Sequence, residues 1–162
     1  MRHVIYLGLG SNIGDRQANL EQTLGLLAEE LDILAVSSIY ETPPWGYADQ
    51  PAFYNQAVKA GTCLKPLALL EFIKSTESGM GRIPTFRYGP RCIDVDILFY
   101  DDLVMATETL TIPHPQLSER AFVLVPLAEI APGLVHPISG RTTTVLLGEV
   151  DQHGIHRITE AA

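Results

Sequence analysis

Residues 4–12 read VIYLGLGSN, a short apolar run that ends in glycines and small polar residues. An apolar run of this length, bounded by turn residues, predicts a buried strand. Asp15 follows it and can cap a helix that runs to about Leu31. The helix is expected to bury one face, on which leucines recur at helical spacing: Leu20, Leu24, Leu27 and Leu31. The chain therefore opens with a strand followed by a helix.

Three glycines, Gly8, Gly10 and Gly14, are expected to shape the turn between this strand and this helix. A dinucleotide-binding fingerprint has the same setting, but here the third glycine comes one residue late for G-x-G-x-x-G. The sequence also contains no G-x-x-x-x-G-K-[ST] phosphate loop. The pattern by itself favours a tight turn with a capped helix over a nucleotide-binding loop.

Strands and helices alternate further along the chain. Pro66 suits the first turn of a helix that extends to about Ser78. Prolines and glycines place loops at residues 42–51 and 79–90. Strands are predicted over three further segments: 33–40, 53–62 and 93–100.

The last third of the chain is expected to be irregular over residues 111–115 and helical from about residue 118 to residue 130. The full order is β-α-β, then β-α-β, then helix-rich material. This order predicts an α+β fold, a ferredoxin-like α/β sandwich with an antiparallel-type sheet and packed helices. A doubly wound parallel sheet is the main alternative.

Length and composition narrow the class of protein. The chain has 162 residues, 46% of them hydrophobic, which suits a single domain over residues 1–162. Its net charge of −8 argues against a nucleic-acid or anionic-membrane partner. The first apolar run is too short for a signal peptide, and no stretch approaches the roughly 20 residues of a membrane helix. Cys63 and Cys92 are expected to be reduced, packed side chains of a cytoplasmic protein.

Residues 90–98 read PRCIDVDIL and place two carboxylates on one strand. Asp94 and Asp96 point to the same face, and the aliphatic side chains around them point to the other. Alternation alone slightly favours a half-buried strand with its polar face in water. Asp is a poor strand former, however, and two same-face carboxylates repel each other without a counter-ion. The Cα atoms are about 6.6 Å apart, so the pair can share Mg²⁺, which prefers oxygen ligands.

Arg82, Arg87 and Arg91 lie in the glycine- and proline-rich loop that precedes the aspartates. Arginines for phosphate beside carboxylates for metal are what phosphoryl transfer needs. The loop also suits a lid that closes over a charged donor, mobile without ligands and ordered with them. A solvated basic loop is the alternative, and it is the stronger interpretation for Arg87.

Aromatic side chains gather with polar ones between positions 42 and 55. A flat heterocycle can stack between two such rings and bond to an amide. For any single ring an ordinary core position is the better interpretation, except for Trp45, which lies among prolines. His114, between Pro113 and Pro115, cannot be mid-helix and is expected on a loop.

Together these segments resemble the 6-hydroxymethyl-7,8-dihydropterin pyrophosphokinase family. They occur in the family's order and spacing from about residue 4 to residue 136, and Pro-Arg-x-x-Asp-x-Asp-x-Leu is the most specific motif. The resembling stretches are residues 8–12, 40–44, 53–55, 77 with 81–82, 90–98 and 113–115.

The resemblance implies a ferredoxin-like sandwich that transfers the β,γ-pyrophosphoryl group of ATP to the hydroxymethyl oxygen of the pterin and releases AMP. It implies ATP as co-substrate and two Mg²⁺ ions bound by Asp94 and Asp96. We expect a monomer that acts on these small molecules, without a nucleic-acid or membrane partner.

The resemblance also assigns roles to individual residues. The residues expected to be catalytic are Arg82, Arg91, Asp94 and Asp96. The residues expected to contact ATP are Lys74, Glu77, Arg82, Arg91, Ile97, Thr111, His114 and Arg120. The residues expected to line the pterin pocket, with Phe53 and Phe122 on opposite sides of the ring, are Thr42, Pro43, Trp45, Phe53, Asn55 and Phe122.

Two other functions stay open from the sequence. A nucleotide or pterin sensor that does not turn over would be expected to lack one of Asp94, Asp96, Arg82 and Arg91, and all four are present. A magnesium-dependent nucleotidyltransferase would also suit two same-face aspartates. It would release pyrophosphate from ATP, whereas a pyrophosphokinase releases AMP.

Overall fold

The computed structural model describes residues 2–46, 48–81 and 92–158. Its centre is an antiparallel sheet of six strands: β1 (His3–Ser11), β2 (Asp32–Val36), β3 (Tyr40–Thr42), β4 (Phe53–Thr62), β5 (Asp94–Tyr100) and β8 (His156–Arg157). They lie in the order β5-β1-β4-β3-β8, and β2 pairs with β4 beside β3. Because β1 runs antiparallel to both β4 and β5, the alternative of a doubly wound parallel sheet is wrong.

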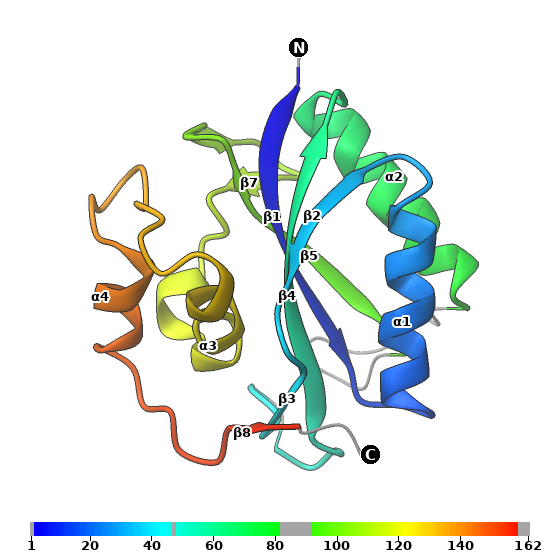
Figure 1. Cartoon of the computed structure of the whole chain (residues 1–162), viewed down its shortest axis with the longest axis vertical. Coiled ribbons are helices and arrows are strands. Elements are labelled where there is room, and N and C mark those ends of the chain that lie inside the picture. The colour runs from blue at the N-terminus through cyan, green and yellow to red at the C-terminus, as the bar shows by residue number, and fades with distance from the viewer. Residues whose placement is uncertain (1, 47, 82–91, 159–162) are drawn as a thin grey trace.

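Helices cover both faces of this sheet (Figure 1). One face carries α1 (Arg16–Leu27) and α2 (Pro66–Gly79), and the other carries α3 (Ala121–Ile130) and α4 (Thr143–Leu147). When β2 and β3 are counted as one interrupted strand, the elements from β1 to β5 run β-α-β, β-α-β, and the third long strand, β5, lies beside the first, as in a ferredoxin-like fold. The prediction of an α+β sandwich is confirmed.

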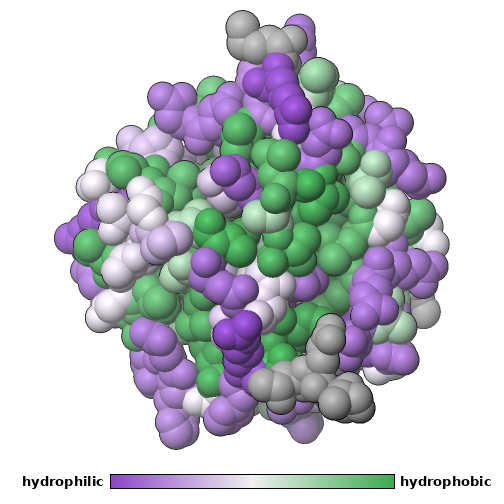
Figure 2. Space-filling view, in the orientation of Figure 1, coloured by the Kyte–Doolittle hydropathy of each residue, from purple (hydrophilic) through white to green (hydrophobic). Residues whose placement is uncertain are grey.

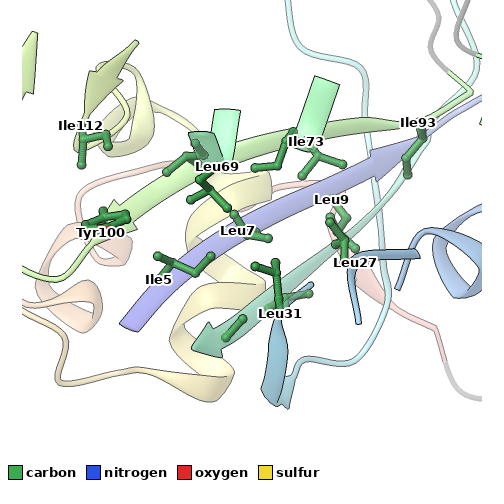
Figure 3. Packing of buried hydrophobic residues seen from close by; sticks show 14 of the residues in the cluster. Ile5, Leu7, Leu9, Leu27, Leu31, Leu69, Ile73, Ile93, Tyr100 and Ile112 are labelled. Carbon is green, nitrogen blue, oxygen red and sulfur yellow. The ribbon is translucent and has the colours of Figure 1, made fainter. Parts of the chain in front are cut away.

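Strand β1 supplies both halves of the core because its side chains alternate between the two faces. Ile5, Leu7 and Leu9 pack under α1 and α2 against residues such as Leu27 and Ile73 (Figure 3). On the opposite face, Tyr6 packs with Phe99 and with α3. Burial on both sides explains why this strand reads as a continuous apolar run.

Several local predictions need correction. Helix α1 begins after Asp15, whose carboxylate accepts a hydrogen bond from Ala18 N–H at 3.1 Å as expected, but it ends at Leu27 rather than at Leu31. The strand predicted over 33–40 is broken: β2 and β3 pair in succession along β4, and Ser37 between them binds Gln56 and Ala57 through side chain and backbone.

Residues 111–115 were expected to be irregular, but Thr111–Ile112 forms β7, which pairs with β6 (Met105–Ala106). A short 3₁₀ helix over Leu117–Glu119 precedes α3. Cys63 is exposed rather than packed, and both cysteines are free thiols.

Gly8 and Gly10 lie inside β1, not in the turn after it, where only Gly14 remains with a positive φ of 72°. Gly8 pairs across the strands with Asp96, and Gly10 pairs with Asp94. A Cβ atom on Gly10 would approach the Asn55 Nδ2 atom to 2.9 Å, closer than real Cβ contacts allow. At position 10, glycine is therefore required by the neighbouring strand β4 rather than by a turn.

The outer strand β2 carries apolar side chains that remain in contact with solvent, with Leu34 47% and Val36 38% exposed. Figure 2, drawn in the orientation of Figure 1, shows hydrophobic surface across the middle of the face along which the strands run. Within the described part of the chain, no helix has the length and apolar character needed to cross a membrane.

The two-sided core makes a stability prediction. Leu20 of α1 is fully buried, so Leu20→Ala removes apolar contacts and leaves a cavity. We expect it to lower the free energy of unfolding by about 2–4 kcal/mol in urea titrations. Leu67→Ala in α2 is the matched control, because that leucine is 49% exposed. Equal losses for both variants would contradict the burial pattern.

Candidate active site

A cavity of about 240 Å³ opens on the α3 side of the sheet. Its walls come from β1, β4, β5, the segment after β3 and the start of α3. The lining residues are Gly8, Leu9, Gly10, Thr42, Pro43, Trp45, Phe53, Asn55, Gln56, Ala57, Asp94, Asp96, His114, Arg120, Phe122 and Val123. Every residue expected at the pterin pocket lies in this lining, together with both aspartates.

The two aspartates reach the cavity because β5 alternates as the sequence suggests. Val95 and Ile97 are buried on the α2 side, whereas Asp94 and Asp96 are half-buried and line the cavity. Their cross-strand neighbours are Gly10 and Gly8, which have no side chains to fill the space beside them. A pair of carboxylates with room beside it is a donor set that fits Mg²⁺.

A histidine and an arginine accompany Asp96. Its Oδ1 lies 4.0 Å from His114 Nε2, and its Oδ2 lies 3.9 Å from Arg120 Nη1. The side chain of Arg120 is only 10% exposed, and its Nε meets no hydrogen-bond partner among the described residues. A buried cation beside an aspartate gives the cavity a place for a ligand of negative charge.

The same arginine supports the aromatic part of the cavity. Its guanidinium carbon lies 4.6 Å from the centre of the Trp45 ring and 5.4 Å from that of Phe122. The two rings are themselves 6.4 Å apart and tilted by 52°. Arg120 thus joins the acidic wall to the aromatic wall, and Gln116 Oε1 accepts its Nη2–H at 2.5 Å.

The polar end of the cavity is fixed by the expected amide. Thr42 Oγ1 donates to Asn55 Oδ1 at 2.5 Å, and Asn55 Nδ2 donates to the Leu9 carbonyl at 3.4 Å. Asn55 is 7% exposed and Thr42 is 1% exposed. Because both side chains are held by strands, their orientation does not depend on a loop.

His114 is neutral at physiological pH. Burial lowers its pKa to about 4, and the nearby positive charge of Arg120 adds to the shift. The backbone N–H of Gln116 donates to Nδ1 at 3.2 Å, so the ring proton belongs on Nε2, the nitrogen that faces Asp96. The imidazole can therefore donate a hydrogen bond without carrying charge.

A second hollow of about 260 Å³ adjoins the first and shares Asp96 and His114 with it. It lies between β5 and the segment that ends in β7. Two further residues expected to contact ATP, Ile97 and Thr111, line it. The aspartate and the histidine therefore stand between the two hollows.

Lys74 and Glu77, also expected to contact ATP, are not among the residues that line either hollow. Lys74 is exposed on α2. Glu77 is 5% exposed, and its Oε2 accepts the backbone N–H of Val95 at 3.0 Å. This bond holds the edge strand between the two aspartates, a role that the sequence did not indicate.

Arg82 and Arg91, expected to be catalytic, lie outside the described residues, as does most of the predicted lid at 79–90. Gln56, Ala57 and Val123 also line the cavity, although no sequence motif marked them. Ala57 had a usable signal, because it follows Phe53 and Asn55 at the spacing that puts strand residues on one face.

These features define a class: a ferredoxin-like α+β protein with an acidic wall and an aromatic wall around one ligand cavity. The family described as 7,8-dihydro-6-hydroxymethylpterin-pyrophosphokinase (HPPK) matches residues 6–132. A 2-amino-4-hydroxy-6-hydroxymethyldihydropteridine pyrophosphokinase of Methylorubrum extorquens is 48% identical over 94% of this chain and 97% of its own. The chain belongs to the HPPK family, and the resemblance seen in the sequence is confirmed.

Other relatives are either similar in length to this chain or much longer. The protein of the same name from Bacillus subtilis is 43% identical over 96% of this chain and 90% of its own. The folic acid synthesis protein of Dictyostelium discoideum is 45% identical over 96% of this chain, which spans only 24% of that longer protein. A crystal structure of Plasmodium falciparum HPPK-DHPS superposes with a TM-score of 0.74 over 92% of this chain and 43% of its own, at 19% identity, and so supports the fold.

The lowered pKa of His114 makes a prediction about stability against pH. Between the folded pKa of about 4 and the ordinary value of 6.5, the unfolded chain binds a proton at this site that the folded chain does not. The contribution of His114 to the free energy of unfolding therefore increases as the pH rises. We expect the site to account for about 2 kcal/mol of the unfolding free energy lost from pH 7 to pH 5.

The measurement compares urea unfolding of the parent and of His114→Gln at both pH values. The variant should lose less stability on acidification than the parent. His153→Gln is the control, because it removes an exposed imidazole. A variant with the parent's pH dependence would show that His114 is not buried in its neutral form.

Proposed function

We propose that the cavity is where this chain carries out the reaction of its family. That reaction moves the β,γ-pyrophosphoryl group of ATP to the hydroxymethyl group of 6-hydroxymethyl-7,8-dihydropterin, in folate synthesis. The observation that carries the proposal is the single cavity that combines stacking rings, a fixed amide and two carboxylates. Each of these features suits one part of the acceptor or of the phosphate chemistry.

The aromatic end takes the pterin. A flat heterocycle would stack between Phe53 and Phe122, which line the same cavity as Trp45, because stacked rings bury apolar area in a fixed orientation. Thr42, Pro43 and Asn55 line the same end, and the amide of Asn55 provides hydrogen bonds for the ring edge. The hydroxymethyl group then points along the cavity toward the aspartates.

The second hollow takes the nucleotide. Ile97, Thr111 and His114 line it, and Asp96 stands where it meets the pterin cavity. Lys74, Glu77, Arg82, Arg91 and Arg120 complete the set that we propose for ATP.

Asp94 and Asp96 would hold the Mg²⁺ ions, two in our proposal. When bound, these ions supply neutralisation of phosphate charge. Arg120 contributes a fixed positive charge, and His114 contributes a neutral donor. A site that is organised before the ligands arrive stabilises developing charge without rearrangement.

The proposed transfer forms one phosphorus–oxygen bond and breaks another. The pterin oxygen forms a bond to the β-phosphorus of ATP, and the bond from that phosphorus to the oxygen shared with the α-phosphate breaks. This oxygen leaves as part of AMP, and the hydroxyl proton passes to solvent water. The chain needs no nucleophilic side chain, because positioning and charge neutralisation account for most of phosphoryl transfer.

We extend the proposal to the setting of the enzyme. Residues 1–162 form one pyrophosphokinase domain, which the two apolar clusters on opposite faces of one sheet support. The enzyme works in the cytoplasm as a monomer. Two free thiols, one of them exposed, suit a reducing compartment.

A first test identifies the products. The protein is mixed with ATP, Mg²⁺ and 6-hydroxymethyl-7,8-dihydropterin, and nucleotides are separated by chromatography. We expect AMP and the pterin diphosphate to appear together. Release of pyrophosphate would favour a nucleotidyltransferase, and binding of both ligands without AMP would favour a sensor.

A second test concerns the carboxylate pair. Asp96→Asn keeps the shape of the side chain and removes its charge, so we expect AMP production to fall at least 100-fold while the Tm stays within a few degrees. Asp102→Asn, on an exposed turn residue, is the matched control and should retain the parent's rate. An Asp96→Asn enzyme with near-normal turnover in Mg²⁺ would contradict the metal assignment.

A third test concerns the aromatic wall. Phe122→Ala should weaken pterin binding about tenfold, equal to about 1.4 kcal/mol, because stacking and apolar burial are both lost. Phe122→Tyr and Phe53→Tyr keep a planar ring and should bind pterin nearly as well as the parent. ATP affinity without pterin should change little in all three. Normal pterin binding by Phe122→Ala would make the ring a packing residue only.

A further inference from the structure

Arg16, the first residue of α1, lies behind the strand pair that carries part of the pterin pocket. We call this pair the pocket hairpin: Tyr40–Thr42 of β3 and residues 53–55 of β4. Its paired positions are Tyr40 with Asn55, Glu41 with Tyr54, and Thr42 with Phe53. The segment that follows Thr42 brings Pro43 and Trp45 into the cavity.

The two faces of the pocket hairpin have different surroundings: one lines the cavity and the other points away from it. Thr42, Phe53 and Asn55 face the cavity and line it. Glu41 and Tyr54 alternate with them and so point to the opposite face. Since β3 has only three residues, its own ladder provides few bonds to hold the cavity side chains in register.

Arg16 contacts the rear of both strands at once. Its Nη1 lies 3.1 Å from the Glu41 carboxylate on β3 and donates to the Ala52 carbonyl, just before β4, at 2.9 Å. Its guanidinium carbon also lies 3.8 Å from the centre of the Tyr54 ring. One side chain therefore joins the strand that enters the pocket segment to the strand that leaves it.

A second side chain from the same part of the chain acts nearby. Asn12, 2% exposed, donates through Nδ2 to Gln50 Oε1 at 2.8 Å and to the Pro51 carbonyl at 3.0 Å. Asn12 and Arg16 thus fasten residues 50–52 to the start of α1. Arg16 is not a lining residue of the cavity, so it cannot act by touching the ligand there.

We infer that Arg16 is a positioning residue for the pterin. It sets the orientation of the pocket hairpin, and through it the placement of Thr42, Phe53 and Asn55, without contacting ATP or the aspartates. This inference rests on the proposed function. The Arg16 and Glu41 side chains are 26% and 38% exposed, so we expect a graded effect rather than loss of activity.

The test measures binding directly. The Kd for 6-hydroxymethyl-7,8-dihydropterin is determined by calorimetry, with a non-hydrolysable ATP analogue and Mg²⁺ present. For Arg16→Gln we expect the pterin Kd to rise about fivefold and the pterin KM to follow it. The ATP KM and kcat should stay within twofold of the parent values. Arg16→Lys keeps the charge but loses the planar fork that spans two partners, so it should be intermediate.

A double-variant cycle separates this mechanism from a general loss of stability. Glu41→Gln should raise the pterin Kd in the same direction, and adding it to Arg16→Gln should cause little further loss if the two side chains act through one contact. Arg141→Gln is the matched control. It removes an arginine that is paired with Glu149 on the surface and lies outside the cavity lining.

The outcomes are distinct. An unchanged pterin Kd in folded Arg16→Gln overturns the inference, as does an equal rise in the ATP KM. If Arg16→Gln does not fold, unchanged pterin Kd values in both Arg16→Lys and Glu41→Gln overturn it. Absence of AMP formation by the parent protein would instead count against the proposed function.

Discussion

The match between two glycines on β1 and two aspartates on β5 is the constraint on which the site depends. Gly8 lies opposite Asp96 and Gly10 lies opposite Asp94, where β1 pairs with the edge strand β5 of a sheet that is covered on both faces (Figure 1). A side chain on Gly10 would collide with Asn55, so a single methyl group would disturb both the amide and the space beside a carboxylate. The same strand fills the other face with aliphatic side chains. One face of β1 thus borders the cavity, and its other face packs into the core.

Three neighbouring side chains help to set the charge of the cavity: Asp96, His114 and Arg120. Asp96 borders both hollows, and it faces one neutral donor, His114, and one permanent cation, Arg120. Because the histidine carries no charge at neutral pH, Arg120 is the cation of this trio. Its contacts with Trp45 and Phe122 mean that the acidic wall and the aromatic wall of the cavity share a side chain. One guanidinium therefore borders both ends of the cavity.

Local sequence rules identified the elements whose signals are local. Pro66 marks the start of α2, and the β-rich composition of Phe53–Thr62 gives the full extent of β4. The glycines of β1 were misplaced, because a glycine required by neighbouring strands looks the same in sequence as one required by a turn. Resemblance to a family selected the aromatic and polar residues that line the first cavity together with both aspartates, but it also selected Lys74 and Glu77, which line neither hollow. Resemblance could not reveal that Glu77 accepts a hydrogen bond from the backbone of β5, or that Arg16 contacts both strands of the pocket hairpin. Both contacts join segments that are distant in sequence.

The bond from Glu77 to the Val95 amide has a consequence for association between molecules. Strand β5 forms one edge of the sheet, and an edge with unpaired N–H groups is a template on which another chain can add a strand. The carboxylate occupies one of these groups, at the point between the two aspartates. A foreign strand that docked here would have to displace the buried Glu77 side chain from this hydrogen bond. The strand that carries both aspartates is therefore less available for pairing with a second chain at this point.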